Sequence, residues 1–404
     1  MAKQTATTSE ISGVLPQDPA AAVTRDIIFV SNSMNEMGGI TSWSHQLARL
    51  LSERGHRVQI VGIVPAPEGR AAEFGDDLPY RTATLYDVHP PSVKAARGLK
   101  DRLDIPEQRR RAARDAGMRQ QAAKLTAIFR AARPGAVVVV TQVWAMEWVA
   151  LADTSNVTVI GMSHESFETC RKSSRFQRVL RYYADVDRML ALTREDADNW
   201  IRQRMDNAGF MPNPLPFFPE TPSRREAKTV VSIGRLHEEK GVDLLLEAWS
   251  LVAPEHPDWT LRIFGAGPEE SALREQASQL GIASSVEWMG RTNDVPSALR
   301  DSSLFVLSSR GEGFPLALME AMATAVPCVA LDVAPGVHEI ISDGEDGLLA
   351  PPGNTPELAR QLGKLMADKD LRDRMGEAAR VNIQRYSTDK IVARWERLFA
   401  LLEV

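Results

Sequence analysis

Short aliphatic runs alternate with amphipathic stretches along most of the chain, and this alternation restricts the fold more than any other feature of the sequence. The first run, at 26–30, precedes a stretch that carries Ile40, Trp43 and Leu47 at helical spacing. Further runs lie at 57–63, 136–141, 157–161, 188–192, 229–233, 260–264, 286–289, 304–307 and 328–331. Such runs are typical of buried strands in a parallel sheet. The alternation therefore predicts an α/β protein built from doubly wound, Rossmann-like units.

A proline-rich segment interrupts the alternation near the middle of the chain. Residues 211–222 contain five prolines, which exclude a helix or a central strand because proline lacks the backbone N–H that both need. A length of 404 residues also exceeds what one hydrophobic core usually supports. We therefore expect a flexible tail at 1–24, one Rossmann-like domain at 25–211, a linker at 212–222, a second such domain at 223–385, and an amphipathic helix at 386–404.

The composition is that of an ordinary globular protein, with 44% hydrophobic and 25% charged residues. No apolar run approaches the roughly 20 residues that a membrane-spanning helix needs, and the first 24 residues lack the apolar core of a signal peptide. Two cysteines, Cys170 and Cys328, cannot form a disulfide scaffold, and no Cys/His cluster has metal-ligand spacing. We therefore expect a cytoplasmic protein.

The net charge of −5 hides a basic first half. Residues 1–215 contain 28 basic and 24 acidic side chains, whereas residues 216–404 contain 20 and 29. Residues 94–133 alone contain twelve basic and four acidic side chains. This basic stretch could contact an anionic membrane, or it could be a solvated helix face. It lacks interleaved aromatic residues and any recognised nucleic-acid-binding motif, so we expect no nucleic acid as a partner.

Two glycines and a histidine follow aliphatic runs of the first half. Ligands bind beyond the carboxyl ends of parallel strands, so residues that follow such runs are candidates for a site. Gly38 and Gly39 could let backbone N–H groups approach a phosphate at a helix N-terminus, or they could form a plain turn. His164 could contact a ligand, or it could be a structural histidine.

Two cations follow the run at 229–233. Arg235 and Lys240 lie in the segment GRLHEEKG, where an arginine could bind phosphate oxygens through two N–H groups and a lysine could add a point charge. The alternative is a surface ion-pair network with Glu238 and Glu239. The position at the end of a strand favours a diphosphate site.

Residues 308–320 read SSRGEGFPLALME and contain two further candidates. Glu312 lies between two glycines, Pro315 is expected to begin a helix, and Glu320 falls about five residues into it. The free N–H groups at the start of that helix suit an anion, and the two carboxylates suit neutral hydroxyl groups. The alternative is a solvated Glu312 and a salt-bridged Glu320.

Two Asp-x-Asp triplets have the spacing of a metal-binding pair, and we reject both. Asp185 and Asp187 are expected at the amino end of a strand, which is the wrong edge for a ligand. Asp368 and Asp370 fall between two late helices. We therefore expect neither a metal ion nor another cofactor.

The second half of the chain resembles the retaining glycosyltransferases of family 4, which have the two-domain GT-B fold. The resemblance rests on GRLHEEKG, FGAGPE and EGFPLALMEAMA, with Glu312 and Glu320 eight residues apart, and covers most of residues 228–350. It extends more loosely to the glycine pair and the histidine of the first half. The segments SNSMNEMGGIT and HES also resemble enzymes that glycosylate cell-wall polymers, such as the poly(glycerol-phosphate) α-glucosyltransferases.

This resemblance implies a role for each candidate residue. Arg235 and Lys240 would hold the donor diphosphate as it leaves, and Glu320 would bind the ribose. The catalytic group would consist of Arg235, Lys240, Glu312 and His164. The remaining donor contacts would come from Gly38, Gly39, Gly313, Phe314, Pro315, Leu316 and Ala317.

The resemblance further implies a retaining, metal-independent transferase. It would move a hexose or N-acetylhexosamine from a nucleotide-diphosphate sugar, with UDP favoured by its frequency in the family. Residues 223–385 would bind the donor, residues 25–211 would face the acceptor, and the helix at 386–404 would cross back to the first domain. The acceptor would be a glycan, a cell-wall polymer or a lipid-linked molecule at the inner face of the cell membrane. The alternatives are a sugar-nucleotide epimerase of the same fold and a degenerate, non-catalytic interaction module.

Overall fold

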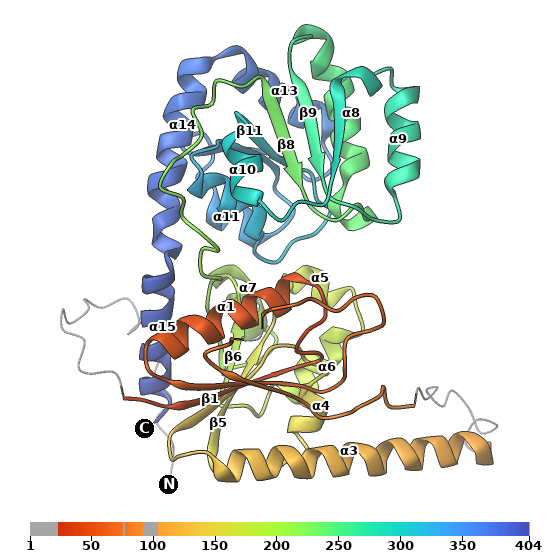
Figure 1. The fold of residues 1–404 in the computed structure, drawn as a ribbon, viewed down its shortest axis with the longest axis vertical. Coiled ribbons are helices and arrows are strands. Elements are labelled where there is room, and N and C mark those ends of the chain that lie inside the picture. The colour runs from red at the N-terminus through yellow and green to blue at the C-terminus, as the bar shows by residue number, and fades with distance from the viewer. Residues whose placement is uncertain (1–22, 76, 92–103, 404) are drawn as a thin grey trace.

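The structure of the chain, a computed structural model, contains two parallel β-sheets with helices packed around them (Figure 1). It describes residues 23–75, 77–91 and 104–403. Most of the expected tail at 1–24, and residues 94–103 of the basic stretch, therefore lie outside the described residues.

The first sheet has seven parallel strands in the order β3-β2-β1-β4-β5-β6-β7. The strands are β1 Asp26–Ser31, β2 Arg57–Gly62, β3 Arg81–Thr84, β4 Ala136–Val140, β5 Val157–Met162, β6 Arg188–Ala191 and β7 Ala208–Phe210. The helices of this half are α1 Gly39–Glu53, α3 Ile105–Ala131, α4 Met146–Val149, α5 Phe167–Arg171, α6 Arg175–Tyr182 and α7 Arg194–Arg202.

The central strand β1 shows why a continuous apolar run predicts this sheet. All six of its residues are buried. Ile27 and Phe29 belong to the core that includes Trp43 of α1, whereas Ile28 and Val30 belong to a separate core that includes Phe129 of α3. Alternate side chains thus pack on opposite faces, and both faces are covered by helices.

The second sheet has six parallel strands in the order β10-β9-β8-β11-β12-β13. The strands are β8 Thr229–Ile233, β9 Thr260–Phe264, β10 Val286–Gly290, β11 Leu304–Leu307, β12 Cys328–Leu331 and β13 Gly347–Ala350. The helices are α8 Val242–Val252, α9 Glu270–Gln279, α10 Val295–Arg300, α11 Leu316–Ala323, α12 Pro335–Ile340, α13 Thr355–Ala367, α14 Lys369–Asn382 and α15 Thr388–Leu401. Both sheets have the strand order of doubly wound folds, so the predicted fold class is confirmed.

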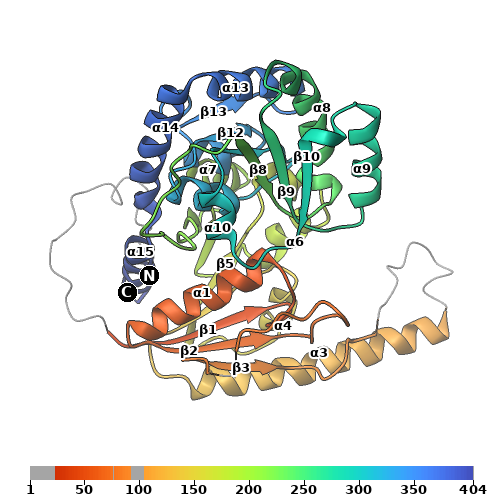
Figure 2. The same cartoon turned by 45° about the horizontal axis from the view of Figure 1, so that its top comes forward.

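Helix α15 lies against α1 of the first half of the chain (Figures 1 and 2). The ring of Trp395 in α15 contacts that of Trp43 in α1, with centroids 6.3 Å apart. Arg54, just after α1, donates to Asp389 at 3.0 Å. The chain thus leaves the first sheet through residues 211–228, which form neither helix nor strand, and returns to it with α15.

Helix α3 runs along the outer face of the first sheet, on the side away from the second sheet (Figures 1 and 2). It has 27 residues, and the side chain of Asp104 caps its first turn by accepting from the Glu107 N–H. Among the residues that the structure describes, α3 included, no helix is both long and apolar enough to cross a membrane.

Candidate functional site

Lys240 and Glu312 form an ion pair at the carboxyl ends of the two central strands of the second sheet, β8 and β11. Lys240 Nζ lies 2.7 Å from Glu312 Oε1, and Ser309 Oγ donates to the same oxygen at 2.6 Å. The Glu312 side chain is only 9% exposed. The alternative of a solvated Glu312 is therefore wrong.

Gly241 brings Lys240 to this position. Lys240 ends a short 3₁₀ turn, Glu238–Lys240, and Gly241 follows with a φ of +60°. A Cβ atom on Gly241 would lie 2.1 Å from the carbonyl oxygen of Ser308. Glycine therefore allows the turn after β8 to pack directly on the end of β11, next to the Glu312 loop.

Arg235 lies on the same edge of the sheet but is more exposed. Its side chain is 65% exposed, and its Nη2 is 3.7 Å from Glu239 Oε2. The ion pair weighed as an alternative is thus present, but such a long and solvated pair contributes little stability. A phosphate could replace Glu239 at small cost.

The Glu312 loop also contacts a loop of the first sheet. A Cβ atom on Gly313 would lie 2.1 Å from the carbonyl oxygen of His164, which follows β5. A Cβ atom on Gly336, in α12, would lie 2.0 Å from the carbonyl oxygen of Gly313. The loop is therefore held between α12 and the His164 loop, with no room for a side chain on either glycine. Residues from the two sheets meet at this point.

His164 has a buried ring nitrogen without a partner. Its Nε2 forms no hydrogen bond to any residue that the structure describes. The ring packs edge-on against Trp43 with centroids 4.6 Å apart, and burial lowers the pKa of His164 to about 4. The imidazole is therefore neutral at pH 7 and offers one unmet hydrogen bond, which suits a neutral hydroxyl group.

Glu320, the fifth residue of α11, is a half-buried carboxylate. No hydrogen bond or ion pair to it occurs among the described residues, so the salt-bridged alternative is wrong. Burial raises its pKa to about 7. A group with this environment is suited to accept hydrogen bonds from neutral hydroxyls that reach it from outside the chain.

Glu320→Gln is expected to stabilise the ligand-free protein at pH 8 by on the order of 1–3 kcal/mol and to change its stability little at pH 4.5. The pKa of Glu320 is about 7 in the folded state against 4.5 ordinarily, so the folded state loses stability as the pH rises from 4.5 to 7. Glutamine carries no charge and avoids that loss. Urea unfolding at both pH values measures the difference, with exposed Glu345→Gln as the control. An equal effect at both pH values would contradict this assignment.

The start of α11 offers free backbone N–H groups. Pro315 is the N-cap residue, and no side chain caps the first turn, which begins with Leu316 and Ala317. The ring of Phe314 is buried against Tyr386, 5.2 Å between centroids, so only its backbone can face a ligand. The four predicted donor-binding residues from Phe314 to Ala317 thus lie together at the start of α11.

Gly38 and Gly39 mark the start of α1 and are exposed. A Cβ atom on either would meet no described residue within 4 Å, and the φ of 165° at Gly38 is extended backbone that any residue adopts. Neither packing nor conformation requires glycine there. The pair therefore leaves open backbone at the carboxyl end of β1, which a ligand could approach.

Contacts join five residues, Trp43, His164, Gly313, Glu312 and Lys240, into one constellation. Trp43 of α1 contacts His164, the His164 carbonyl contacts Gly313, and Glu312 binds Lys240. Sequence reasoning did not single out Trp43, Ser309 or Gly241 as members. Gly241 could have been recognised in the sequence, because a glycine directly after Lys240 allows a left-handed turn.

The rejected Asp-x-Asp triplets have structural roles. Asp187 lies at the amino end of β6 and accepts from the Val159 N–H at 2.8 Å. Asp368 caps α14 by accepting from the Leu371 N–H at 2.9 Å. Across residues 23–75, 77–91 and 104–403, no group of three or more His, Cys, Asp or Glu side chains could hold a metal ion.

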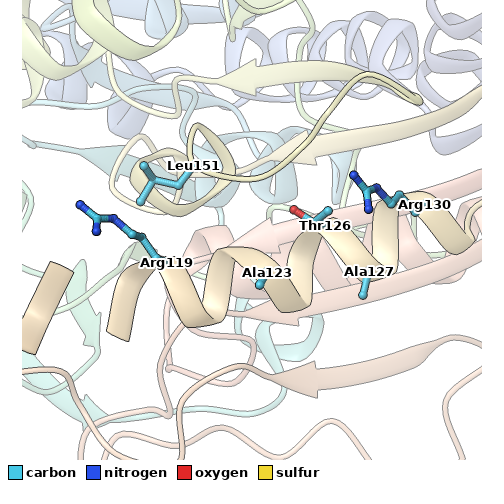
Figure 3. Close-up of a pocket in the computed structure, with 6 residues that line it drawn as sticks. All are labelled: Arg119, Ala123, Thr126, Ala127, Arg130 and Leu151. Carbon is cyan, nitrogen blue, oxygen red and sulfur yellow. The ribbon is translucent and has the colours of Figure 1, made fainter. Parts of the chain in front are cut away.

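A hollow of about 480 Å³ beside α3 is separate from this constellation (Figure 3). Five of its lining residues come from α3 and the sixth is Leu151. Arg130, at one end, is paired with Asp153 at 2.8 Å. The hollow contains none of the predicted site residues.

Comparison with known proteins decides the family. The family model described as Glycosyl transferases group 1 matches residues 216–382. An uncharacterized glycosyltransferase of Haemophilus influenzae is 34% identical over 246 residues, which cover 60% of this chain and 69% of that protein. The chain belongs to the group 1 glycosyltransferases. This is family 4, whose members retain the donor's anomeric configuration and use no metal ion, so the predicted family is confirmed.

Two further similarities are narrower. One covers only part of the related protein, and the other shows the fold alone. An exopolysaccharide phosphotransferase of Streptomyces coelicolor is 36% identical over 258 residues, 63% of this glycosyltransferase but only 27% of that longer protein. A crystal structure of a Staphylococcus aureus TarM mutant, in complex with Fondaparinux, alpha-GlcNAc-glycerol and UDP, has a TM-score of 0.75 at 15% identity. It covers 93% of this chain and 100% of that one. The predicted GT-B fold is thereby confirmed.

Proposed function

We propose that this glycosyltransferase moves a hexose or N-acetylhexosamine from a UDP-sugar to a glycan, cell-wall polymer or lipid-linked acceptor. The observation that carries the proposal is the part-buried Lys240–Glu312 pair, held at 2.7 Å where loops of both sheets meet. UDP is present in the TarM complex of the same fold, and a poly(glycerol-phosphate) alpha-glucosyltransferase of Bacillus subtilis is among the relatives.

Arg235 and Lys240 take the place of a metal ion in this proposal. Both lie after β8, on the sheet edge where a diphosphate would lie. Fixed cations stabilise the negative charge that develops as the diphosphate leaves. The guanidinium of Arg235 can bind two oxygens at once, and Lys240 exchanges its bond to Glu312 for one to a phosphate.

Glu312, Glu320 and His164 orient the donor through its hydroxyl groups. Glu312 and the backbone from Gly313 to Pro315 bind the sugar, the neutral His164 contacts it from the other loop, and Glu320 binds the ribose. The amides of Leu316 and Ala317 and the open backbone at Gly38 and Gly39 complete the donor contacts. The acceptor hydroxyl attacks from the face that the diphosphate leaves, so no protein nucleophile is required.

The assignment of the two domains is part of the same proposal. Residues 223–385 bind the donor, residues 25–211 face the acceptor, and residues 212–222 link them, with the helix at 386–404 joined to the first domain. A site formed by two domains is typically completed when they close on the substrates.

Measurement of UDP release from a panel of UDP-sugars, with and without poly(glycerol phosphate) and lipid-linked saccharides, tests the proposal. A transferase releases UDP at a rate that depends on the acceptor. Conversion of the UDP-sugar without any acceptor would instead identify an epimerase of the same fold. A donor that binds, seen as a thermal shift of the unfolding transition, but never turns over would identify an interaction module.

We also propose that α3 contacts the inner, anionic face of the cell membrane. Arg109 and Arg119 are exposed on this helix. The helix lies on the side of the first sheet that faces away from the second sheet (Figure 1). Each basic residue near an anionic leaflet contributes about 1 kcal/mol. We expect Arg109→Gln/Arg119→Gln to weaken sedimentation with phosphatidylglycerol vesicles by roughly tenfold or more at low salt.

The control for this membrane prediction is a pair of exposed basic residues elsewhere. Lys364 and Arg374 lie on α13 and α14, and Lys364→Gln/Arg374→Gln should leave vesicle binding unchanged. Wild-type binding that does not fall as salt is added would show that charge is not the cause. An absence of binding would exclude membrane contact without affecting the transferase.

A further inference from the structure

A second hollow lies where the chain crosses between the two halves of the molecule. It has a volume of about 950 Å³ and is lined by residues of β7, α7, α12 and α15, together with residues just after α1 and β7 and just before α15. Its charged lining residues are Arg54, Arg194, Arg385, Lys390, Arg394 and Arg397, with Glu339 and Asp389. Six cations and two carboxylates leave a formal net charge of +4 in one cavity.

Most of these cations have no carboxylate to neutralise them. Within the described part of the chain, only Arg54 forms an ion pair, with Asp389 at 3.0 Å. Arg385 donates to the carbonyl oxygens of Glu339 and Ile340 at 2.6 and 2.8 Å. Such neutral acceptors orient a guanidinium but leave its charge uncompensated.

Two of the arginines are stacked on one aromatic ring. The guanidinium carbons of Arg194 and Arg394 lie 5.1 and 4.1 Å from the centroid of Phe210. Arg394 also donates to the carbonyl oxygen of Phe210 at 2.8 Å. The fold therefore holds two like charges close together on a ring that is attractive to cations but cannot neutralise them.

Helix α15 carries three of these charges, Arg394 included, on a single face. Lys390, Arg394 and Arg397 are separated by four and three residues, so their side chains are neighbours on the helix surface. Like charges at this spacing repel and weaken the helix. The side chains of Lys390 and Arg397 are exposed and form no hydrogen bond or ion pair with any described residue, so an outside anion can reach them.

We propose that this hollow binds a small molecule with a diphosphate or with two or more phosphate groups, at a site distinct from the donor site. The fork of N–H groups on arginine matches phosphate oxygens, and a multiply charged group matches the excess positive charge. The volume is that of an ordinary small-molecule site. Tyr386 lines the hollow and contacts Phe314, so the site lies directly behind the start of α11. The proposal goes beyond the transferase activity and does not depend on it.

Titration calorimetry of inorganic pyrophosphate into the full chain, at constant ionic strength, tests this site. We expect Lys390→Gln/Arg397→Gln to weaken binding by at least tenfold, because both charges are lost while α15 loses only repulsion. The matched pair Lys364→Gln/Arg374→Gln removes one lysine and one arginine from exposed positions elsewhere and should leave the affinity within twofold.

The variant Arg235→Ala/Lys240→Ala removes the two cations of the donor site and so distinguishes that site from this hollow. Pyrophosphate binding that depends on Lys390 and Arg397 should persist in this variant. The proposal is overturned if pyrophosphate does not bind, or if the matched pair weakens binding as much as the hollow variant. It is also overturned if removal of Arg235 and Lys240 abolishes all binding. Circular dichroism confirms that each variant retains its helices.

Discussion

Alanine in place of Lys240 is expected to lower kcat by about 10²–10³-fold, the effect of removing one group that stabilises developing negative charge. Lys240 Nζ lies 2.7 Å from Glu312 Oε1, so the ion pair holds the cation at the strand end. Alanine removes both the charge for the leaving diphosphate and the partner of Glu312. UDP release under saturating donor and acceptor measures the loss.

The effect of Lys240→Ala on the stability of the fold has to be separated from its effect on catalysis. Lys240→Ala leaves a 9% exposed carboxylate with Ser309 as its remaining hydrogen-bond donor among the described residues, which lowers the free energy of unfolding by about 1–3 kcal/mol. Lys240→Ala/Glu312→Gln should recover that stability but not the activity. Lys228→Ala, which breaks an exposed ion pair with Asp258 at the amino end of the same strand, is the matched control. A fully active Lys240→Ala variant would contradict the diphosphate assignment.

The central strands could be predicted from the sequence, and the two edge strands of the first sheet could not. Strands β1 and β4 are covered on both faces, so every residue is apolar or buried and the run is continuous. The edge strand β3, Arg81–Thr84, reads RTAT and its residues are exposed or half-buried. The other edge, β7, has three residues, one of them glycine. Neither has enough buried apolar surface to leave a pattern in the sequence.

The site shows the same division between local and long-range information. Each candidate loop could be placed at the end of a strand because parallel strands deliver their following loops to one edge. Which side chains then pair could not be predicted. The bond from Lys240 to Glu312 spans 72 residues and depends on the contact of Gly241 with Ser308, which only the folded sheet creates. The contact between His164 and Gly313 joins two different sheets and has no local signal at all.

Gly313→Ala is expected to lower kcat by about 10²-fold, although it neither adds nor removes a charge. An alanine Cβ there would lie 2.1 Å from the His164 carbonyl oxygen, far closer than two such atoms approach, and the obstacle is backbone that cannot rotate away. The Glu312 loop must therefore move away from the His164 loop. A displacement of about 1 Å in a positioning group is enough for a hundredfold loss.

Gly311→Ala provides the control for that prediction within the same loop. Its Cβ atom would lie 3.4 Å from Thr169 Oγ1, an ordinary van der Waals contact, so the loop keeps its position and the activity should change by less than about threefold. Equal activities of the two variants would mean that the meeting of the Glu312 and His164 loops does not position the donor. A selective loss in Gly313→Ala, with the unfolding transition retained, would instead assign this contact between the two halves of the chain to catalysis, because the substitution removes no charged or hydrogen-bonding group.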